Sequence, residues 1–239
     1  MRKKKNSASR LSAVKEFIYE HSGEPMSDPA GKVFLNTGAP VMLEIGAGKG
    51  AFACEMAKRN PECAYFAMER VTDCVVLAAE RAASYTEGGV GNLKFIMQTA
   101  DRLTEIFAPL SVDSLFLNFS DPWPKKGYAK RRLTHRRYLS VYFNLLKDGG
   151  ELVFKTDNVG LFDFTLEEIE AMGLVPEVVT RDLHSSEWND GNVMTEYETN
   201  FSSQGIKINM VKVKKPMDFM PDIPQELTVG GLDFARAQG

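Results

Sequence analysis

Short apolar runs alternate with longer stretches in which apolar residues recur at helical spacing along most of this chain. Short runs rich in β-branched and aromatic side chains predict buried strands, and the longer stretches predict helices. Strands are predicted at 41–45, 64–68, 93–97, 114–119 and 151–154. Helices are predicted at 51–59, 71–85, 101–107, 138–146 and 161–172.

The predicted strands and helices alternate with the spacing of βαβ units, in which crossover helices join parallel strands. Two further strands are predicted at 174–180 and 206–213, on either side of the irregular stretch 182–200. A closing hairpin of these two strands would make the sheet mixed. The predicted fold class is therefore α/β, a mostly parallel seven-stranded sheet with helices on both faces.

Both ends of the chain depart from this regular pattern, which covers residues 41–213. Residues 1–40 hold a short predicted helix at 11–20 and a turn-rich stretch, and we interpret them as a basic N-terminal arm. Residues 214–239 contain three prolines and two adjacent glycines, so we interpret them as a tail that lies over the surface or is disordered.

Charge and composition limit the classes of partner. The chain of 239 residues has a net charge of −3, so any contact with nucleic acid must come from local basic patches. One such patch is 1–10 and a second is 125–137. The sequence shows no apolar segment long enough to span a membrane and no secretory signal, so we expect a cytoplasmic protein.

The cysteines and histidines do not predict a metal site. Cys54, Cys63 and Cys74 form no CxxC pair, and the three histidines are scattered. We therefore expect reduced structural thiols and no bound metal.

A glycine-rich loop follows the first predicted strand, in the sequence EIGAGKG at 44–50. Its spacing differs from the G-x-G-x-x-G of dinucleotide enzymes and from the phosphate-binding loop of nucleotide hydrolases. Glu44, two residues before Gly46, is more typical of S-adenosylmethionine sites, where it can hold the methionine end. Glu69, at the tip of the second strand, can accept both ribose hydroxyls. The loop after the third strand would meet the adenine.

The stretch LNFSDPWPKKGYAKRRLT at 117–134 carries the most specific chemistry. Asp121 follows the fourth predicted strand, and the two prolines on either side of Trp123 make the turn stiff. No carboxylate occurs between Asp121 and Asp148, and the basic patch lies in this interval. The arrangement can present a nucleobase to a reactive group while holding its phosphates. The alternatives are a solvated basic face and a tight loop around a buried tryptophan.

These motifs together resemble the bacterial tRNA (guanine-N7)-methyltransferase family over residues 41–213. The marks of the resemblance are LNFSDPWPKK followed by KRRLT, and then FKTDN at 154–158, DLHS at 182–185 and MTEYE at 194–198. The resemblance implies a Rossmann-like class I methyltransferase fold and the cofactor S-adenosyl-L-methionine. It also implies methyl transfer to N7 of a guanosine in the tRNA variable loop, at tRNA position 46, by a monomer or homodimer.

The resemblance further implies a role for individual residues. The implied cofactor contacts are Glu44, Gly46, Gly48, Glu69, Thr99 and Asp121, and Asp121 is also the implied catalytic residue. The implied contacts of the guanosine or its surroundings are Lys125, Asp157, Thr195, Glu196, Tyr197 and Glu198. The implied RNA contacts are Gly127, Tyr128, Ala129, Lys130, Arg131 and Arg132.

Two positions depart from the family pattern. Thr99 stands where the family usually has an aspartate that contacts adenine; Asp101 is close enough in sequence to compensate. Gly127 and Tyr128 stand where the family usually has Arg-His, which removes a charge that could pair with phosphate.

Guanine N7 is an acceptor without a proton, so the displacement needs no general base. The site must align the reacting atoms and stabilise the positive charge that develops on the guanine. Asp121, Asp157 and either Glu196 or Glu198 are the candidate carboxylates. Thr195 and Glu198 can instead form a helix N-cap and capping box.

The sequence leaves three other functions open. The first is methyl transfer from the same cofactor to another RNA or to a small molecule. The second is an NAD(P)-dependent dehydrogenase, because Glu69 also suits a ribose hydroxyl. The third is a non-catalytic RNA-binding subunit with the same fold.

Overall fold

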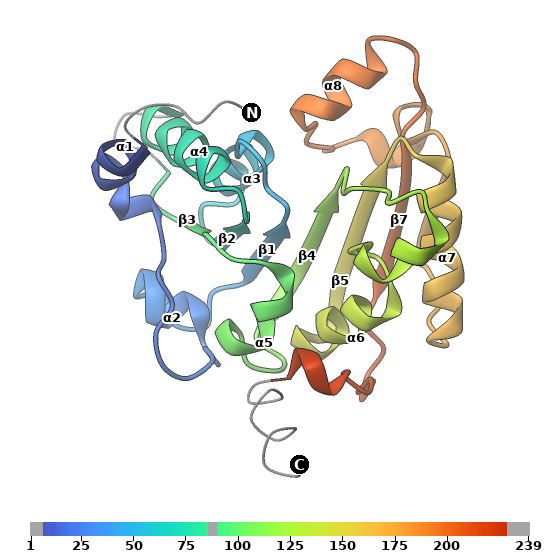
Figure 1. Cartoon of the computed structure of the whole chain (residues 1–239), viewed down its shortest axis with the longest axis horizontal. Coiled ribbons are helices and arrows are strands. Elements are labelled where there is room, and N and C mark those ends of the chain that lie inside the picture. The colour runs from blue at the N-terminus through green and yellow to red at the C-terminus, as the bar shows by residue number, and fades with distance from the viewer. Residues whose placement is uncertain (1–6, 86–89, 229–239) are drawn as a thin grey trace.

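The computed structural model describes residues 7–85 and 90–228 (Figure 1). A seven-stranded sheet has the order β3-β2-β1-β4-β5-β7-β6. The first five strands are parallel, whereas β7 is antiparallel to β5 and β6. The strands are β1 (Val41–Ile45), β2 (Ala64–Met68), β3 (Leu93–Ile96), β4 (Val112–Asn118), β5 (Leu146–Thr156), β6 (Val178–Thr180) and β7 (Asn209–Lys214).

The helices of the described residues lie on both faces of this sheet. The α-helices are α1 (Ser7–Ala13), α2 (Pro29–Phe34), α3 (Ala51–Arg59), α4 (Thr72–Tyr85), α5 (Leu103–Ile106), α6 (Arg136–Leu145), α7 (Val159–Ala171) and α8 (Glu196–Ser202). The 3-10 helices are η1 (Lys15–Phe17), η2 (Ala100–Arg102), η3 (Lys126–Arg131), η4 (Leu183–Ser185), η5 (Glu187–Asn189) and η6 (Gln225–Leu227). The predicted α/β fold class is confirmed.

Alternation along the strands sorts the core into two layers, because successive strand residues point to opposite faces. Leu43 and Ile45 belong to the cluster that α2, α5, α6 and α7 cover. Tyr65 and Ala67 belong to the cluster that α3 and α4 cover. Glu44 has the same orientation as this second set, since its neighbour Leu43 belongs to the first. The Glu44 carboxylate therefore points toward the layer between the sheet and helices α3 and α4.

Strands β1, β2 and β3 agree with the prediction to within one residue, but β5 begins five residues earlier than predicted. The pair Gly149-Gly150 was expected to precede the strand and instead lies inside it. A register shift between Val112 and Ser114 of β4 accommodates this irregular start. Strand β6 is shorter than predicted because Pro176, which has no amide donor, precedes it.

The N-terminal segment packs onto the domain from Arg10 onward. Arg10 makes a bidentate ion pair with Glu80 of α4, at 2.7 and 2.6 Å. The single helix predicted at 11–20 is wrong, because α1 ends at Ala13 and the amide of Tyr19 donates to Phe95 O beside β3, at 2.8 Å. The basic residues of the predicted arm at 2–5 lie outside the described residues.

The C-terminal segment 215–228 also packs onto the fold. Lys215 is buried and its Nζ donates to Leu146 O at 2.9 Å. Thr104 Oγ1 donates to the backbone oxygen of Leu227 at 2.6 Å. This part of the predicted tail lies over the surface, as one of the two sequence interpretations expected, and residues 229–239 are not described.

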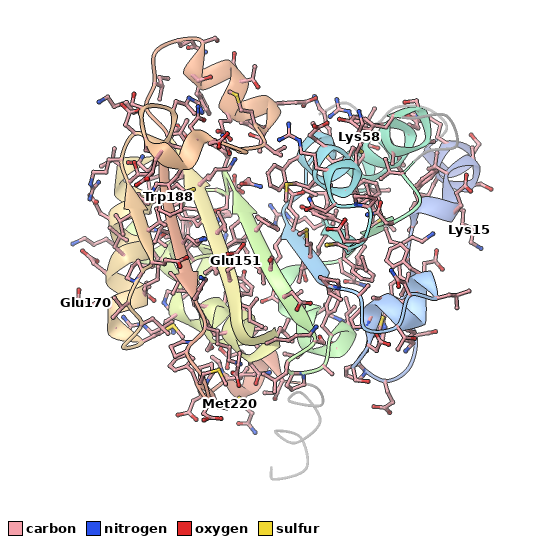
Figure 2. The ribbon with its side chains drawn as sticks, turned by 180° about the vertical axis from the view of Figure 1, so that it is seen from behind. Lys15, Lys58, Glu151, Glu170, Trp188 and Met220 are labelled. Atoms are coloured by element: carbon pink, nitrogen blue, oxygen red, sulfur yellow. The ribbon has the colours of Figure 1, made fainter. Side chains whose placement is uncertain are left out.

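The face covered by α3 and α4 carries ion pairs over β5 and β7. Lys212 Nζ lies 3.4 Å from Glu151 and 2.9 Å from Glu177, and above the ring of Trp188. Figure 2 shows this face, with Glu151 on β5 and Trp188 nearer to α8. On the opposite face of the sheet, the core contains the strand neighbours of Glu151 and Lys212, which are Leu152 and Val213.

Candidate active site

A cleft of about 1290 Å³ opens at the carboxyl ends of the parallel strands, the edge where open α/β sheets bind ligands. Helix α8 lies at this end of the sheet, opposite the end where the described chain finishes (Figure 1). The predicted residues that line the cleft are Glu44, Gly46, Gly48, Glu69, Thr99, Asp121, Gly127, Tyr128, Lys130, Arg131, Thr195, Glu196 and Tyr197. The predicted residues outside its lining are Lys125, Ala129, Arg132, Asp157 and Glu198.

The glycine-rich loop forms the floor of the cleft between β1 and α3. Gly46, Gly48 and Gly50 have φ angles of 83°, 55° and 74°, which favour glycine. A Cβ at Gly50 would also lie 2.7 Å from the Cβ of Ala78. The amide of Gly46 donates to Met68 O at 2.8 Å, so the loop is held against β2.

Glu69 links the loop to the end of β2. Its Oε2 accepts from the amide of Gly48 at 3.0 Å and its Oε1 accepts from the amide of Val71 at 2.8 Å. A carboxylate has about four acceptor positions, so each oxygen can accept another hydrogen bond. The side chain is therefore fixed and still able to bind a pair of hydroxyls.

Glu44 is buried at the end of β1, with 2% of its surface exposed. Its Oε1 accepts from Asn118 Nδ2 at 3.1 Å. Among the described residues, no group donates to its Oε2. Burial raises the pKa of Glu44 to about 7.

Two more buried polar atoms at the end of β4 also have no partner among the described residues: Asn118 Oδ1 and Ser120 Oγ. Buried polar groups are normally satisfied, so these atoms indicate a polar ligand. An ammonium donor near Glu44 Oε2 and a diol near Glu69 would satisfy the site. These are groups of S-adenosylmethionine, and the residues present therefore fit this cofactor.

Thr99 lies at the start of η2 on the side of the cleft beyond β3, and it is exposed there. Asp101 also lines the cleft, but its Oδ1 accepts from Arg137 at 2.7 Å and from the hydroxyl of Tyr138 at 2.9 Å. Asp101 therefore lies where it could supply the carboxylate that Thr99 lacks, but one of its oxygens already accepts two hydrogen bonds.

Asp121 is placed as predicted, just past β4, and 71% of its side chain is exposed. Its Oδ2 lies 3.9 Å from Arg70 of the β2 loop. The turn is unusual in its backbone, because Phe119 and Trp123 have positive φ angles of 51° and 39°. An observed strain of this kind is typical of functional sites.

Arg132, a predicted RNA contact, also holds this turn. Its Nε donates to Pro122 O at 3.0 Å and its guanidinium nitrogen donates to Trp123 O at 3.2 Å. The stiffness of the turn therefore comes from Arg132 as well as from the prolines.

Two aromatic rings and one arginine form the mouth of the cleft. Trp123 meets Tyr128 edge to face with centroids 5.9 Å apart. The guanidinium of Arg131 lies 5.1 Å from the ring of Trp123 and 4.7 Å from that of Tyr128. Trp123 is half-buried and lines the cleft, so it is neither a core residue nor fully exposed to solvent.

Helix α8 forms the opposite wall. Thr195 Oγ1 accepts from the amide of Glu198 at 2.9 Å, which confirms the N-cap interpretation. Glu196 pairs with Arg81 of α4 at 2.5 Å, and Tyr197 stacks on Phe119 with centroids 6.4 Å apart. Glu198 is fully buried, with its carboxylate against Lys155, and therefore cannot contact a substrate in this arrangement.

Sequence reasoning did not single out Asn118, Lys155 or Arg81. Asn118 could have been found, because it is a polar residue in an otherwise apolar run. It lies two residues after Phe116, so both side chains point to the same face of the strand. Arg81 could not, since its partner Glu196 is 115 residues away.

Asp157 and Lys125 lie apart from the cleft lining. Asp157 follows β5, at the strand end adjacent to that of β4, as predicted. Lys125 precedes η3 and is exposed. Both remain at the same edge of the sheet as the cleft.

The described residues contain no group of three or more histidine, cysteine or acidic side chains that could hold a metal ion. Within the same residues, no helix combines the length and apolar character needed to cross a bilayer.

Comparison with known proteins connects this geometry to a family. A model of the family described as "Putative methyltransferase" matches residues 38–211, from the approach to β1 to the middle of β7. The match includes the glycine-rich loop, the turn at Asp121 and helix α8.

Solved structures of methyltransferases share the fold. The 16S rRNA methyltransferase KamB has a TM-score of 0.60 at 15% identity, covering 83% of this chain and 98% of that chain. An antibiotic-related methyltransferase has a TM-score of 0.56 at 16% identity, covering 81% and 95%. The 16S rRNA (adenine(1408)-N(1))-methyltransferase from Catenulisporales acidiphilia, with cosubstrate SAM, has a TM-score of 0.54 at 14% identity, covering 84% and 96%.

At such identities the structural likeness establishes the fold alone, which is that of class I methyltransferases. The family match covers most of the chain and goes further. The chain belongs to this methyltransferase family, and the polar atoms of its cleft that lack a partner among the described residues fit S-adenosyl-L-methionine, the cofactor expected from the sequence.

Proposed function

We propose that this protein transfers a methyl group from S-adenosylmethionine to N7 of a guanosine in the variable loop of tRNA. The observation that carries the proposal is the continuity of the cleft. One cavity extends from Glu44 and Glu69 to Asp121 and on to Arg131. The carboxylates that suit the cofactor and the basic, aromatic mouth that suits RNA therefore open into the same space.

Bound S-adenosylmethionine supplies an electrophilic methyl group on a sulfonium. In the proposal, Glu44 holds the ammonium of its methionine end and Glu69 holds the ribose hydroxyls. Thr99 and Asp101 lie where the adenine would be met. These roles match donors and acceptors to the partner-free atoms of Glu44, Asn118 and Ser120.

Asp121 acts on the guanosine. It is exposed at the cleft between the cofactor end and the basic mouth. A carboxylate here accepts from the N1–H and 2-amino groups of guanine and stabilises the positive charge that arrives on the ring. Adenine lacks this pair of donors, so the same contact selects guanine. No general base is required, because N7 carries no proton.

Lys130 and Arg131 bind the phosphates beside the target, and Trp123 and Tyr128 offer faces on which an extruded base can stack. Tyr197 and Glu196 approach from α8 on the other side of the cleft. Asp157 and Lys125 lie at the same sheet edge, where they can contact the nucleotides next to the target.

A methylation assay with the full chain tests this proposal. We expect labelled S-adenosylmethionine to label unmodified tRNA transcript, and reduction followed by aniline treatment to break the labelled tRNA at a variable-loop guanosine. Label without that break would move the reaction to another atom. Label that enters rRNA and not tRNA would replace the substrate. Cofactor binding without labelling of any RNA would point to a small acceptor or to a non-catalytic subunit.

A further inference from the structure

Three buried polar side chains from neighbouring strands lie on one face of the sheet at the cleft. Glu44 of β1 is in register with Phe116 of β4, which is in register with Val153 of β5. Two residues further along, Asn118 and Lys155 occupy the same face, because strand side chains repeat with a period of two. The face therefore carries Glu44, Asn118 and Lys155 across three adjacent strands.

Lys155 is buried, with 3% of its side chain exposed, and it uses all three of its ammonium hydrogens. It donates to Glu198 Oε2 at 2.6 Å, to Asn192 Oδ1 at 3.0 Å and to Val193 O at 2.9 Å. Its Nζ also lies 5.2 Å from the ring centre of Phe52, which lines the cleft. Lys155 thus connects β5 to the segment that leads into α8.

Glu198 completes this connection from the side of α8. Besides Lys155, its carboxylate accepts from Asn192 Nδ2 at 2.7 Å and lies 2.9 Å from His184 Nε2. Glu198 follows directly after Tyr197 and lies two residues from Glu196, both of which line the cleft. The buried carboxylate therefore fixes the position of the exposed residues of α8.

The buried charges do not balance. With His184 counted as neutral, and above about pH 7, where Glu44 is mostly ionised, Glu44 and Glu198 contribute two negative charges and Lys155 one positive charge. Buried charges are costly unless paired, so the set lacks one cation near Glu44 Oε2, the atom without a partner. The ammonium of the cofactor's methionine end supplies that cation.

We propose that Lys155 is a positioning residue that joins the cofactor end of the cleft to helix α8, by facing Glu44 on the sheet and Glu198 on the helix. The proposal rests on the function proposed above, which places the cofactor at Glu44 and the RNA base at α8. Loss of the lysine charge then weakens cofactor binding, and loss of either partner of the pair weakens the hold on RNA.

The directions of the pKa shifts of Glu44 and Lys155 are consistent with an interaction between the two charges. Burial raises the pKa of Glu44, and the charge of Lys155 opposes this rise. Burial lowers the pKa of Lys155, and both Glu198 and Glu44 oppose that change. The other titratable groups that act on or are affected by Glu44 are Glu69, Tyr65 and Cys54.

The single change Lys155→Met would leave Glu198 buried without its cation and is expected to impair folding. The test therefore uses the double variant Lys155→Gln/Glu198→Gln, which removes both charges and keeps amides that can bond to each other. The matched control is Glu198→Gln alone, in which Asn192 Oδ1, Val193 O and the introduced amide oxygen can still accept from the three ammonium hydrogens of Lys155 and so keep its charge solvated. Circular dichroism and thermal melting establish that each variant is folded.

The readout is cofactor affinity, measured by calorimetry from pH 6 to pH 9 in the absence of RNA. If the pKa of Glu44 rises by about one unit in the double variant, its ionised fraction at pH 7 falls about fivefold, and so does affinity relative to the native protein. The ratio returns to near one at pH 9, where Glu44 is ionised in both proteins. Glu198→Gln alone should not lose affinity at pH 7.

The second readout is steady-state kinetics with tRNA. We expect KM for tRNA to rise in both variants, because both loosen α8. A ratio of cofactor affinities that does not vary with pH would overturn the electrostatic link, and an unchanged KM would overturn the link to α8. Absence of tRNA methylation by the native protein, with the pH effect intact, would instead reject the proposed tRNA function and keep Lys155 as part of the cofactor site.

Discussion

The two ends of the cleft are built in different ways. At the cofactor end, Glu44 is buried and Glu69 has both oxygens bonded to backbone amides of neighbouring loops. At the end where we propose that RNA binds, Asp121 is mostly exposed, with its closest cation 3.9 Å away. The first region is shaped by the backbone of the sheet, and the second by side chains on a strained turn.

This difference indicates where rigidity is needed. A small cofactor is bound by a fixed pocket, so the atoms that receive it are preformed and some lack partners until it arrives. The RNA of the proposed function would bring its own charge and shape, so the residues proposed to meet it can remain solvated until binding. The strained residues Phe119 and Trp123 stand between the two regions and set the position of Asp121.

The largest effect is expected at Asp121. Because its side chain is mostly exposed, Asp121→Ala should leave a folded protein with nearly unchanged melting. Removal of a charge that stabilises the transition state should lower kcat/KM by about 10²–10³-fold. Single-turnover methylation of tRNA measures this loss, with Asp121→Asn as the matched control for shape. Turnover within a few-fold of the native protein would remove Asp121 from the chemistry.

A smaller effect, on stability, is expected at Glu44. Its pKa is about 7 in the fold and 4.5 when unperturbed. Because the folded value is the higher one, its contribution to stability is present below pH 4.5 and is lost as pH rises to about 7. The size of this loss is on the order of 3 kcal/mol.

Glu44→Gln removes that titration. Denaturant unfolding at pH 5 and pH 8 should therefore show a smaller decrease for the variant than for the native protein, both without cofactor. Calorimetry should also show weaker cofactor binding by the variant at pH 8, where the native carboxylate is ionised. An identical pH dependence of stability in the two proteins would contradict the buried, ionisable state of Glu44.

Loss of one phosphate contact should have a more modest effect. Arg131→Ala should raise KM for tRNA about three- to tenfold. It should also reduce the slope of the logarithm of the binding constant against the logarithm of salt concentration by about one. The comparison is Lys15→Ala, an exposed lysine on η1 at the edge of the molecule (Figure 2). Equal effects of the two substitutions would mean that the basic mouth has no special part in RNA binding.

The smallest effect is expected for the ion pair between α8 and α4. Glu196 and Arg81 are half-exposed, and such pairs contribute roughly 0.2–1 kcal/mol. Glu196→Ala should lower stability by less than about 1 kcal/mol and raise KM for tRNA about two- to threefold, since the cap by Thr195 is kept. Unchanged turnover at unchanged stability would mean that the segment Thr195–Glu198 serves only as the N-cap of α8.

Much of the cofactor end could be predicted from local sequence. The acid before the glycines and the acid at the tip of β2 lie where the predicted strands end, so the alternation of strands already brings Glu44 and Glu69 to one edge. The positive φ angles of Gly46, Gly48 and Gly50 explain why this loop is recognisable in sequence.

The proposed RNA end of the cleft was predicted only in outline. The turn at Asp121 was correctly placed, but the hydrogen bonds from Arg132, a predicted RNA contact, to the backbone of that turn were not foreseen. Glu198 was expected to meet the substrate and is instead buried against Lys155, 43 residues away along the chain. In both cases a charged residue in a motif has a structural partner that no local pattern reveals.

The sequence by itself determined the order of strands and helices, the glycine loop and the stiff turn, because these depend on backbone preferences and hydrophobic periodicity within a few residues. The tertiary structure alone decided which charges face the cleft and which are buried. That choice depends on pairs such as Lys155 with Glu198 and Arg81 with Glu196, which only the crossovers of the folded sheet bring together. The physical reason is burial. A charge inside the protein requires a partner, whereas a charge at the mouth of the cleft is solvated by water.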